Sequence, residues 1–464
     1  MGLNNRIDLM KEEIINSTVE LVKIKSVEEP AKEGMPFGEG PHKALEKALE
    51  ISKNLGFRVT NLDGYVGYAE YGEGEEYVAA LGHLDVVPEG EGWKYGPYDA
   101  TIAERKIFGR GTSDDKGPTV AALYGLKAIM DENLPISKRI RIIFGLNEET
   151  GGADIEHYLT KEKPPVAAFT PDAEYPLING EKGLTGFQLV RGFENLKDGK
   201  VIVEKIYGGQ AGNIVADYCN LVLRCEDSHE VKKRIQEFAT ENSFEIEISE
   251  EGDLLKVKCI GISAHASTPH MGLNAIMMAV KLAVSLEIPC DDMGEYLKFL
   301  DNKIGFNLHG EEFGCYLEDE VSGKLTFNVG IIDVDRKSSN LRLDLRYPVT
   351  KVLDDMLIPF NKTLEGTGIE IAKFSHCEPL YFDAENELVK KLQKVYTDIT
   401  NEEATLISIG GGTYAKSMPN TLAFGPEFPG DENTNIHKPN EFIKIDNLIK
   451  NAKIYAKALY ELAK

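Results

Sequence analysis

Cysteine is scarce in this chain and tryptophan almost absent. Of 464 residues, 6 are cysteine and 1 is tryptophan. The cysteines are scattered, without the C-x-x-C spacing of many redox and metal sites. Disulfide scaffolds are concentrated in small secreted domains, which this long chain does not resemble. We therefore expect reduced, packed thiols and a reducing cytoplasmic location.

Long apolar runs and basic charge are also in short supply. The N-terminal segment lacks the apolar core of a signal peptide, and no later run reaches the roughly 20 apolar residues that span a bilayer. Acidic residues number 76 against 52 basic ones, a formal net charge of −24. Such a charge repels phosphate backbones and anionic lipid. The expected protein is soluble and binds neither nucleic acid nor membrane.

The first part of the chain alternates helical and strand-like patterns. Apolar residues at three- and four-residue steps predict helices around residues 7–21 and 45–55. Short apolar runs at 77–81, 140–146 and 166–169 surround a helical pattern at 118–130. This alternation is typical of an α/β domain with a mostly parallel, helix-covered sheet.

From about residue 183 the pattern changes. Strand-like segments such as 256–260, 326–332 and 341–347 alternate with helices, and every cysteine lies in this region. The end of the chain returns to helix, Gly-rich loop and strand, and closes with an amphipathic helix over 445–462. These changes predict a discontinuous domain, 1–182 and 380–464, interrupted by an inserted α+β domain over 183–379.

Candidate functional residues follow the predicted ends of strands. His83, the pair Glu148-Glu149 and Asp172 each come after an apolar run. In open α/β sheets, functional groups gather beyond the carboxyl ends of the strands. An imidazole together with several carboxylates is what a paired-metal hydrolytic site requires. The sequence therefore predicts an enzyme.

Each of the first three motifs also has a structural interpretation. In His83-Leu84-Asp85, residues two apart on an extended backbone share a side, so Asp85 could hold the His83 ring while the other ring nitrogen binds metal. Asp114 could bridge two cations, or simply cap the helix that begins near residue 118. Glu148 and Glu149 point apart, so one could bind metal and the other transfer protons, unless both belong to a solvated acidic turn.

Three more features stay open on residue grounds alone. Asp172 lies in a turn in which Glu174 is a competing candidate. His437 could supply a second neutral imidazole, or be an ordinary surface histidine. The glycine-rich run 409–413 could offer backbone N–H groups to a carboxylate, or could be bent for packing.

Five segments in the same order carry a family resemblance. The chain resembles the co-catalytic zinc dipeptidases and aminoacylases, most closely the PepV-type dipeptidases. The matching segments are H-L-D-V-V-P at 83–88, G-R-G-T-S-D-D-K-G-P at 109–118, N-E-E-T at 147–150, P-D-A-E at 171–174 and I-H-x-P-N-E at 436–441.

The resemblance implies a role for each residue of the first domain, which would be the catalytic one. Asp114 would bridge two metal ions, with His83 and Asp172 on one ion and Glu149 and His437 on the other. Glu148 would be the general base, and Asp85 would hold the His83 ring. The peptide bond between Asp114 and Asp115 is expected to be cis.

The inserted domain carries its own match and would act as a lid. The segment 261–267 implies that His265 donates a hydrogen bond to the oxyanion, although Ala266 stands where the family often has glycine. Asn213 and Arg346 would hold the substrate, and Arg346 would form a bidentate ion pair with its terminal carboxylate. The alternative for each is a hydrogen-bonded lid residue. Because PepV-type chains supply the histidine within one polypeptide, a monomer is implied.

The resemblance therefore implies a metal-dependent dipeptidase acting on small dipeptides with a free amino terminus. An N-acyl amino acid deacylase is the alternative enzyme, because the same chemistry cleaves other amides. A catalytically silent binding protein on the same scaffold is the alternative from another class. Two divalent ions are the expected cofactors, with Zn²⁺ first and Mn²⁺ or Co²⁺ open because His and carboxylate ligands accept several ions.

Overall fold

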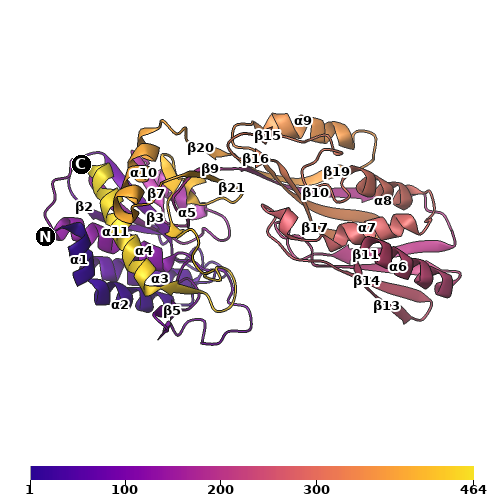
Figure 1. Ribbon diagram of the computed structural model, residues 1–464, viewed down its shortest axis with the longest axis horizontal. Helices are drawn as coiled ribbons and strands as arrows, with labels where there is room; N and C mark the ends of the chain where they lie inside the picture. Colours follow the sequence, from indigo (N-terminus) through magenta and orange to yellow (C-terminus); the bar gives the residue numbers. More distant parts are fainter. Residues whose placement is uncertain (1) are drawn as a thin grey trace. The chain divides into compact units, whose positions relative to one another are not determined.

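The computed structural model describes residues 2–464 and divides into two compact units. Unit 1 contains Met1–Asn179, Phe382–Ile407 and Gly412–Lys464, whereas unit 2 contains Gly180–Tyr381 and Ser408–Gly411. In Figure 1 the indigo N-terminal and yellow C-terminal segments lie together in unit 1. The first unit is thus built from both ends of the chain.

The main sheet of unit 1 is parallel at its centre and antiparallel toward its edges. Strand β6 pairs parallel with β3, β3 with β7, and β7 with β22. The β1–β2, β2–β6 and β22–β9 pairs are antiparallel. The strands are β1 (Arg58–Leu62), β2 (Val66–Tyr71), β6 (Arg139–Gly145), β3 (Tyr77–His83), β7 (Ala167–Thr170), β22 (Thr421–Ala423) and β9 (Leu177–Glu181), with β20 (Leu380–Tyr381) and β21 (Leu406–Ile409) pairing to β9. Every residue of β3 is buried, as expected for a central parallel strand.

Helices cover this sheet, and most of them match the predicted periodic segments. They are α1 (Leu3–Leu9), α2 (Lys11–Val22), α3 (Glu39–Asn54), α4 (Lys116–Asp131), α5 (Ala153–Lys161), α10 (Glu387–Thr400) and α11 (Ile445–Ala463). The predicted single helix near the N-terminus is wrong, because the chain turns at Met10, where ψ is 9° and the amide bonds to Ile7. Helix α4 packs along α11 (Figure 1).

Short strands complete unit 1. Strands β4 (Thr101–Ala103), β5 (Lys106–Phe108) and β24 (Phe442–Lys444) form a small antiparallel sheet. Strand β8 (Ala173–Glu174) pairs parallel with β23 (Pro426–Glu427). The β24–β5 pair brings the segment after His437 to the segment before Asp114, which matters for the site.

Unit 2 is an antiparallel sheet of eight strands with four helices. The order is β13-β14-β12-β11-β17-β18-β10-β19. The strands are β10 (Gly183–Gly192), β11 (Val201–Gly208), β12 (Tyr218–Cys225), β13 (Glu245–Glu251), β14 (Leu254–Ile260), β17 (Thr326–Asp335), β18 (Ser338–Tyr347) and β19 (Glu370–Cys377), with β15 (Glu318–Asp319) and β16 (Gly323–Lys324) pairing separately. The helices are α6 (Ser228–Asn242), α7 (Ala275–Ser285), α8 (Asp292–Lys303) and α9 (Leu353–Leu364).

Burial alternates along the strands of unit 2. Phe187 and Leu189 of β10 are buried, whereas Gln188 between them is partly exposed. The buried strand residues share one core with helix residues such as Leu297 and Phe360. One face of the sheet is therefore packed against helices, and the other carries polar side chains.

The predicted fold class, an α/β catalytic-type domain with an inserted α+β domain, is confirmed. All six cysteines are free, and Cys219, Cys259 and Cys315 are buried as expected. The expectation of packed thiols is wrong for Cys290 and Cys377, which are exposed. Within residues 2–464, none of the helices combines the length and apolar character needed to cross a bilayer.

Candidate metal centre

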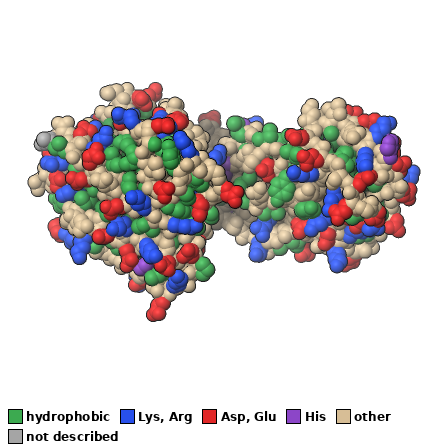
Figure 2. Space-filling model, turned by 90° about the horizontal axis from the view of Figure 1, so that it is seen from below, with side chains coloured by type: hydrophobic (Ala, Val, Ile, Leu, Met, Phe, Trp, Pro, Cys, Tyr) green, Lys and Arg blue, Asp and Glu red, His purple; other side chains and the backbone are tan. Residues whose placement is uncertain are grey.

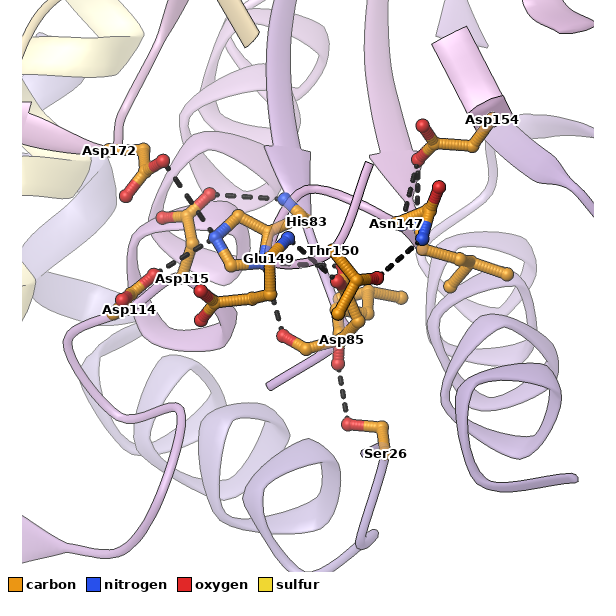
Figure 3. Close-up of polar contacts among 12 residues, drawn as sticks. Ser26, His83, Asp85, Asp114, Asp115, Asn147, Glu149, Thr150, Asp154 and Asp172 are labelled. Atoms are coloured by element: carbon orange, nitrogen blue, oxygen red, sulfur yellow. Dashed lines mark hydrogen bonds and ion pairs between the residues drawn. The ribbon is translucent and has the colours of Figure 1, made fainter. Parts of the chain in front are cut away.

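Three neighbouring parallel strands of unit 1 end at the same place. Strand β3 ends at His83, opposite Gly145 at the end of β6, and β7 lies on the other side of β3. The Glu148-Glu149 pair follows β6, and Asp172 follows β7. Their side chains therefore converge beyond the carboxyl edge of the sheet, around the His83 ring (Figure 3).

Asp114 lies between two imidazoles that are far apart in the sequence. Its Oδ1 is 2.9 Å from His83 Nε2, and its Oδ2 is 2.8 Å from His437 Nε2. The loop that carries Asp114 ends in a cis peptide bond to Asp115, as the family resemblance implied. Each carboxylate oxygen of Asp114 thus faces a different imidazole, the arrangement of a carboxylate that bridges two cations.

The other predicted ligands surround this carboxylate. Glu149 lies 3.1 Å from His437 Nε2, and Asp172 Oδ2 lies 3.8 Å from His83 Nε2. The competing Glu174 is exposed in β8. Two groups of three have donor atoms all within 4.8 Å of one another, namely His83 with Asp114 and Glu149, and His83 with Glu148 and Asp172. The structure brings the five predicted ligands and Glu148 into one cluster.

Asp85 contacts both sides of this cluster. The Nδ1 atom of His83 lies 3.0 Å from the Asp85 carbonyl and 3.4 Å from its carboxylate. The same carboxylate accepts the Glu149 backbone N–H at 3.1 Å. Asp85 therefore holds the ring that precedes it and the turn that carries Glu149.

Burial and crowding of like charges dominate the electrostatics. Burial raises the pKa of Glu148 to about 8, and the nearby carboxylates Glu149 and Asp114 act in the same direction. Burial, followed by the charge on Asp114, also raises the pKa of Asp172 and of Glu149. The positive charge near these carboxyl groups is thus too small to offset their burial and mutual repulsion.

The two imidazoles and Asp114 shift one another's pKa values toward their charged forms. Burial opposes a charge on His437, but Asp114 and Glu149 more than offset it and raise its pKa to about 10. Burial likewise opposes charge on Asp114, and its contacts with His437 and His83 nevertheless lower its pKa. Both imidazoles thus interact strongly with the same carboxylate.

The donor set fits divalent cations. Atoms bound to one cation at about 2.0–2.2 Å lie within roughly 4 Å of one another, close to the spacing of the donors seen here. Carboxylates outnumber imidazoles in the cluster, so added positive charge would relieve their repulsion. His437 is half-exposed, with 51% of its side chain accessible, which leaves the cluster open to solvent on one side.

Glu441 is a supporting residue whose role the sequence analysis missed. This fully buried carboxylate accepts backbone N–H groups from Gly111 and Ser113 at 3.0 Å and from Asp114 at 3.3 Å. Its other oxygen binds Arg110 at 2.7 Å. Because Glu441 lies four residues after His437, it ties the two loops together. Its position at the end of the I-H-x-P-N-E segment was the feature of the sequence that could have indicated this role.

The Glu148-Glu149 turn has a support of its own. Asp154 accepts the backbone N–H groups of Leu146 at 2.6 Å and Asn147 at 3.0 Å. The Asn147 side chain accepts N–H groups from Gly152 and Ala153 at the start of α5. It also donates to Thr150 Oγ1 at 2.6 Å (Figure 3). No local pattern pointed to Asp154, because its contacts depend on the folded turn.

His265 and Asn213, the predicted lid residues, lie on paired segments of unit 2. The Ala266 N–H donates to the Asn213 carbonyl at 2.9 Å, and Val215 N–H donates to Ala264 at 2.8 Å. Buried Asn328 donates to the carbonyls of Gly212 and Ile214, on either side of Asn213. Both His265 and Asn213 are exposed. The structure thus places these two residues on adjacent backbone segments.

Arg346 is close to His265 but is already paired. Its Nη2 lies 3.5 Å from His265 Nε2, and its Nη1 donates to the Gly410 carbonyl at 2.6 Å. Its Nε and Nη2 also donate to Asp344, at 2.8 and 3.2 Å. The Gly-rich run therefore offers a carbonyl to this arginine, and Asp344 orients its guanidinium. These contacts all lie within unit 2.

Two curated relatives match nearly the whole chain. "Putative dipeptidase YtjP" of Bacillus subtilis strain 168 is 38% identical over 463 residues, covering 98% of each chain. "Putative dipeptidase SAB1611c" of Staphylococcus aureus strain RF122 / ET3-1 is 33% identical over 466 residues, again covering 98% of each.

Solved structures show the same fold at lower identity. Human carnosine dipeptidase 1 superimposes with a TM-score of 0.61 at 15% identity, covering 99% of this chain and 98% of that one. Aminopeptidase PepT from Bacillus cereus ATCC 10987 gives a TM-score of 0.58 at 15% identity, with 98% and 99% covered. The family profile of peptidase family M20/M25/M40 matches residues 79–461. This chain is therefore a member of peptidase family M20/M25/M40.

Proposed function

We propose that the protein is a metal-dependent dipeptidase that hydrolyses dipeptides with a free amino terminus. The observation that carries the proposal is Asp114, whose two oxygens face His83 at 2.9 Å and His437 at 2.8 Å. The dipeptidase names of the two curated relatives support the substrate class.

In this proposal, unit 1 is the catalytic domain and unit 2 is the lid. His83, Asp114 and Asp172 would hold one cation, and Asp114, Glu149 and His437 the other. We infer zinc, with manganese or cobalt as the alternatives. Bound divalent cations supply Lewis-acid chemistry, lowering the pKa of water and stabilising negative charge on a carbonyl oxygen.

The residues of the chain would then transfer the protons and bind the substrate. Glu148 would accept a proton from the attacking water and pass it to the departing amine. His265 would donate a hydrogen bond to the carbonyl oxygen as charge develops there. Asn213 and Arg346 would hold the substrate, and Arg346 would bind its terminal carboxylate.

Metal removal tests the cofactor assignment. Protein purified without chelator should contain close to two divalent ions per chain by elemental analysis and should hydrolyse Ala-Ala. Dialysis against chelator should abolish turnover, and zinc, manganese or cobalt should restore it. Turnover unchanged by complete metal removal would contradict the proposal.

Glu148→Gln tests the general base. The amide keeps the shape of the side chain but cannot accept the proton, so we expect at least a hundredfold lower kcat with both metal ions retained. Thr150→Ser, at an exposed position in the same turn, is the matched control and should keep wild-type turnover. Normal turnover by metal-loaded Glu148→Gln would exclude this role.

The substrate class separates the two enzymatic alternatives. Comparing Ala-Ala with N-acetyl-Ala-Ala and N-acetyl-Ala distinguishes a dipeptidase from an N-acyl amino acid deacylase. Preference for the free amino terminus supports the proposal. Preference for the acetylated compounds would assign the deacylase activity instead.

A further inference from the structure

A hollow of about 380 Å³ lies on the polar face of the unit 2 sheet. Residues of β10, β18 and β19 line it, and Gly212 and Asn213 border it. Gly186 pairs with Asp344 on one side and with Ser375 on the other, so these three positions form one row across the sheet. Gly186 has no side chain, and Ser375 Oγ reaches over it, 2.6 Å from where a Cβ atom would lie.

Two positively charged side chains, those of Arg342 and Lys373, lie in the next row of the sheet. Gln188 pairs directly with Arg342 on one side and Lys373 on the other, which places both cations on the same face as Gly186. With neighbouring strands about 4.8 Å apart, their backbones are roughly 10 Å apart, within reach of one ligand between their long side chains. Both side chains are exposed.

Most basic residues of this acidic chain form an ion pair with a carboxylate, but among the described residues Arg342 and Lys373 do not. Within residues 2–464, no ion pair involves Arg342 or Lys373. Asp344 is the one carboxylate among the described lining residues, and its two oxygens already accept from Arg346. The hollow therefore has two uncompensated positive charges in a protein of net charge −24.

The hollow also adjoins the residues that would hold the substrate. Asn213 borders it directly, and the Arg346 guanidinium reaches back to Asp344 in its wall. Arg346 and Arg342 are four residues apart on β18, about 13 Å along the strand. Their long side chains shorten the distance between the two guanidinium groups, because that of Arg346 already reaches back to Asp344.

We propose that this hollow receives the carboxylate side chain of the substrate's C-terminal residue, so that dipeptides ending in Glu or Asp are preferred. Arg346 would bind the terminal carboxylate, while Arg342 and Lys373 bind the side-chain carboxylate. The inference rests on the proposed dipeptidase function and adds a substrate class to it.

The test compares Ala-Glu with Ala-Gln, which differ in side-chain charge but hardly in size. Metal-loaded wild-type protein should show at least a tenfold higher kcat/KM for Ala-Glu. Arg342→Ala combined with Lys373→Ala should lower kcat/KM for Ala-Glu at least tenfold, mainly through KM, and change that for Ala-Gln less than twofold.

A second double variant controls for net charge. Lys256→Ala with Lys258→Ala removes two exposed cations from β14 of the same unit, outside the hollow. It should leave the Ala-Glu to Ala-Gln ratio at the wild-type value. An equal loss in both double variants would assign the effect to long-range charge and overturn the proposal.

The remaining outcomes separate this inference from the proposed function. Hydrolysis of Ala-Ala, Ala-Glu and Ala-Gln at similar rates, or a preference for Ala-Lys, would overturn the hollow's role and leave the dipeptidase intact. If metal-loaded protein hydrolyses none of these dipeptides, the proposed function fails and the inference fails with it.

Discussion

At the scale of single residues, one buried carboxylate connects the two loops of the candidate metal centre. Glu441 binds three backbone N–H groups around Asp114 and the guanidinium of Arg110. Residues that orient metal ligands without touching the metal commonly change metal affinity when replaced. The position of Asp114 relative to His437 therefore depends on a residue that lies outside the donor set.

Glu441→Gln should weaken metal binding. The amide retains one acceptor for the backbone but loses the charge that balances buried Arg110, so the Asp114 loop should shift. We expect about tenfold to hundredfold weaker zinc binding, measured by competition with a chromogenic chelator. Glu432→Gln, at an exposed carboxylate paired with Lys106, is the control. Unchanged zinc affinity in Glu441→Gln would show that the loop does not need this support.

Glu427, a carboxyl group outside the proposed donor set, is expected to make the stability of the fold depend on pH. Burial raises the pKa of Glu427 from 4.5 to about 7. A carboxyl group with a higher pKa in the folded state stabilises the fold while protonated, and this contribution is lost as the pH rises from about 4.5 to about 7. Glu427→Gln stays neutral and should avoid that loss.

Urea unfolding at pH 5 and pH 8 checks this expectation. Between these values the free energy of unfolding of wild type should fall by about 1–3 kcal/mol more than that of Glu427→Gln. Parallel changes in the two proteins would show that Glu427 titrates normally. Both proteins should be measured in the same metal-loaded state, so that the metal centre contributes equally.

At the scale of elements, a glycine sets the distance between two long helices. A Cβ atom on Gly125 of α4 would lie 2.8 Å from the backbone nitrogen of Ala456 in α11. Such a close approach leaves no room for a side chain, and the opposing atom belongs to backbone that cannot rotate away. Helix propensity alone would favour alanine at this position by about 1 kcal/mol.

Gly125→Ala should therefore destabilise the protein, against its helix propensity. Forcing a methyl group into this contact should cost about 1–3 kcal/mol in the free energy of unfolding. Urea denaturation measures the change, and Lys127→Ala on the same helix should be close to neutral, because its ion pair with Asp131 is partly exposed. A stabilised Gly125→Ala would show that the helices separate easily.

Local patterns predicted most of these elements. The apolar segments at 77–81 and 140–146 became β3 and β6, and the amphipathic pattern at 445–462 became α11. The turn at Met10 and the antiparallel outer strands were not visible in the sequence, since periodicity reports which face is buried and not the pairing partner.

At the scale of the whole molecule, we expect a single chain in solution because the protein is strongly acidic. Acidic and basic side chains are interspersed on the face shown in Figure 2, while the net charge is −24. Like charge between copies opposes association. Unit 2 also forms its eight-stranded sheet within one chain.

Light scattering should accordingly give a mass near 51.4 kDa. The value should not change over a hundredfold dilution, because a monomer has no association equilibrium. A mass near twice this value would contradict the monomer. In that case, sheet edges β13 and β19 would be the first places to examine, since edge strands offer unpaired backbone groups.

The sequence by itself determined the residue types of the site and the strands that deliver them. His83, Glu148, Glu149 and Asp172 follow segments whose apolar character predicts buried strands, and the local motifs named Asp114 and His437. Only the tertiary structure decided that Asp114 lies between His83, 31 residues before it, and His437, far after it. It also decided that Glu441 supports the Asp114 loop and that Asp344 orients Arg346. The contacts of His437 and Glu441 with the Asp114 loop join segments more than three hundred residues apart. They depend on the pairing of strands and loops in space, which local periodicity does not encode.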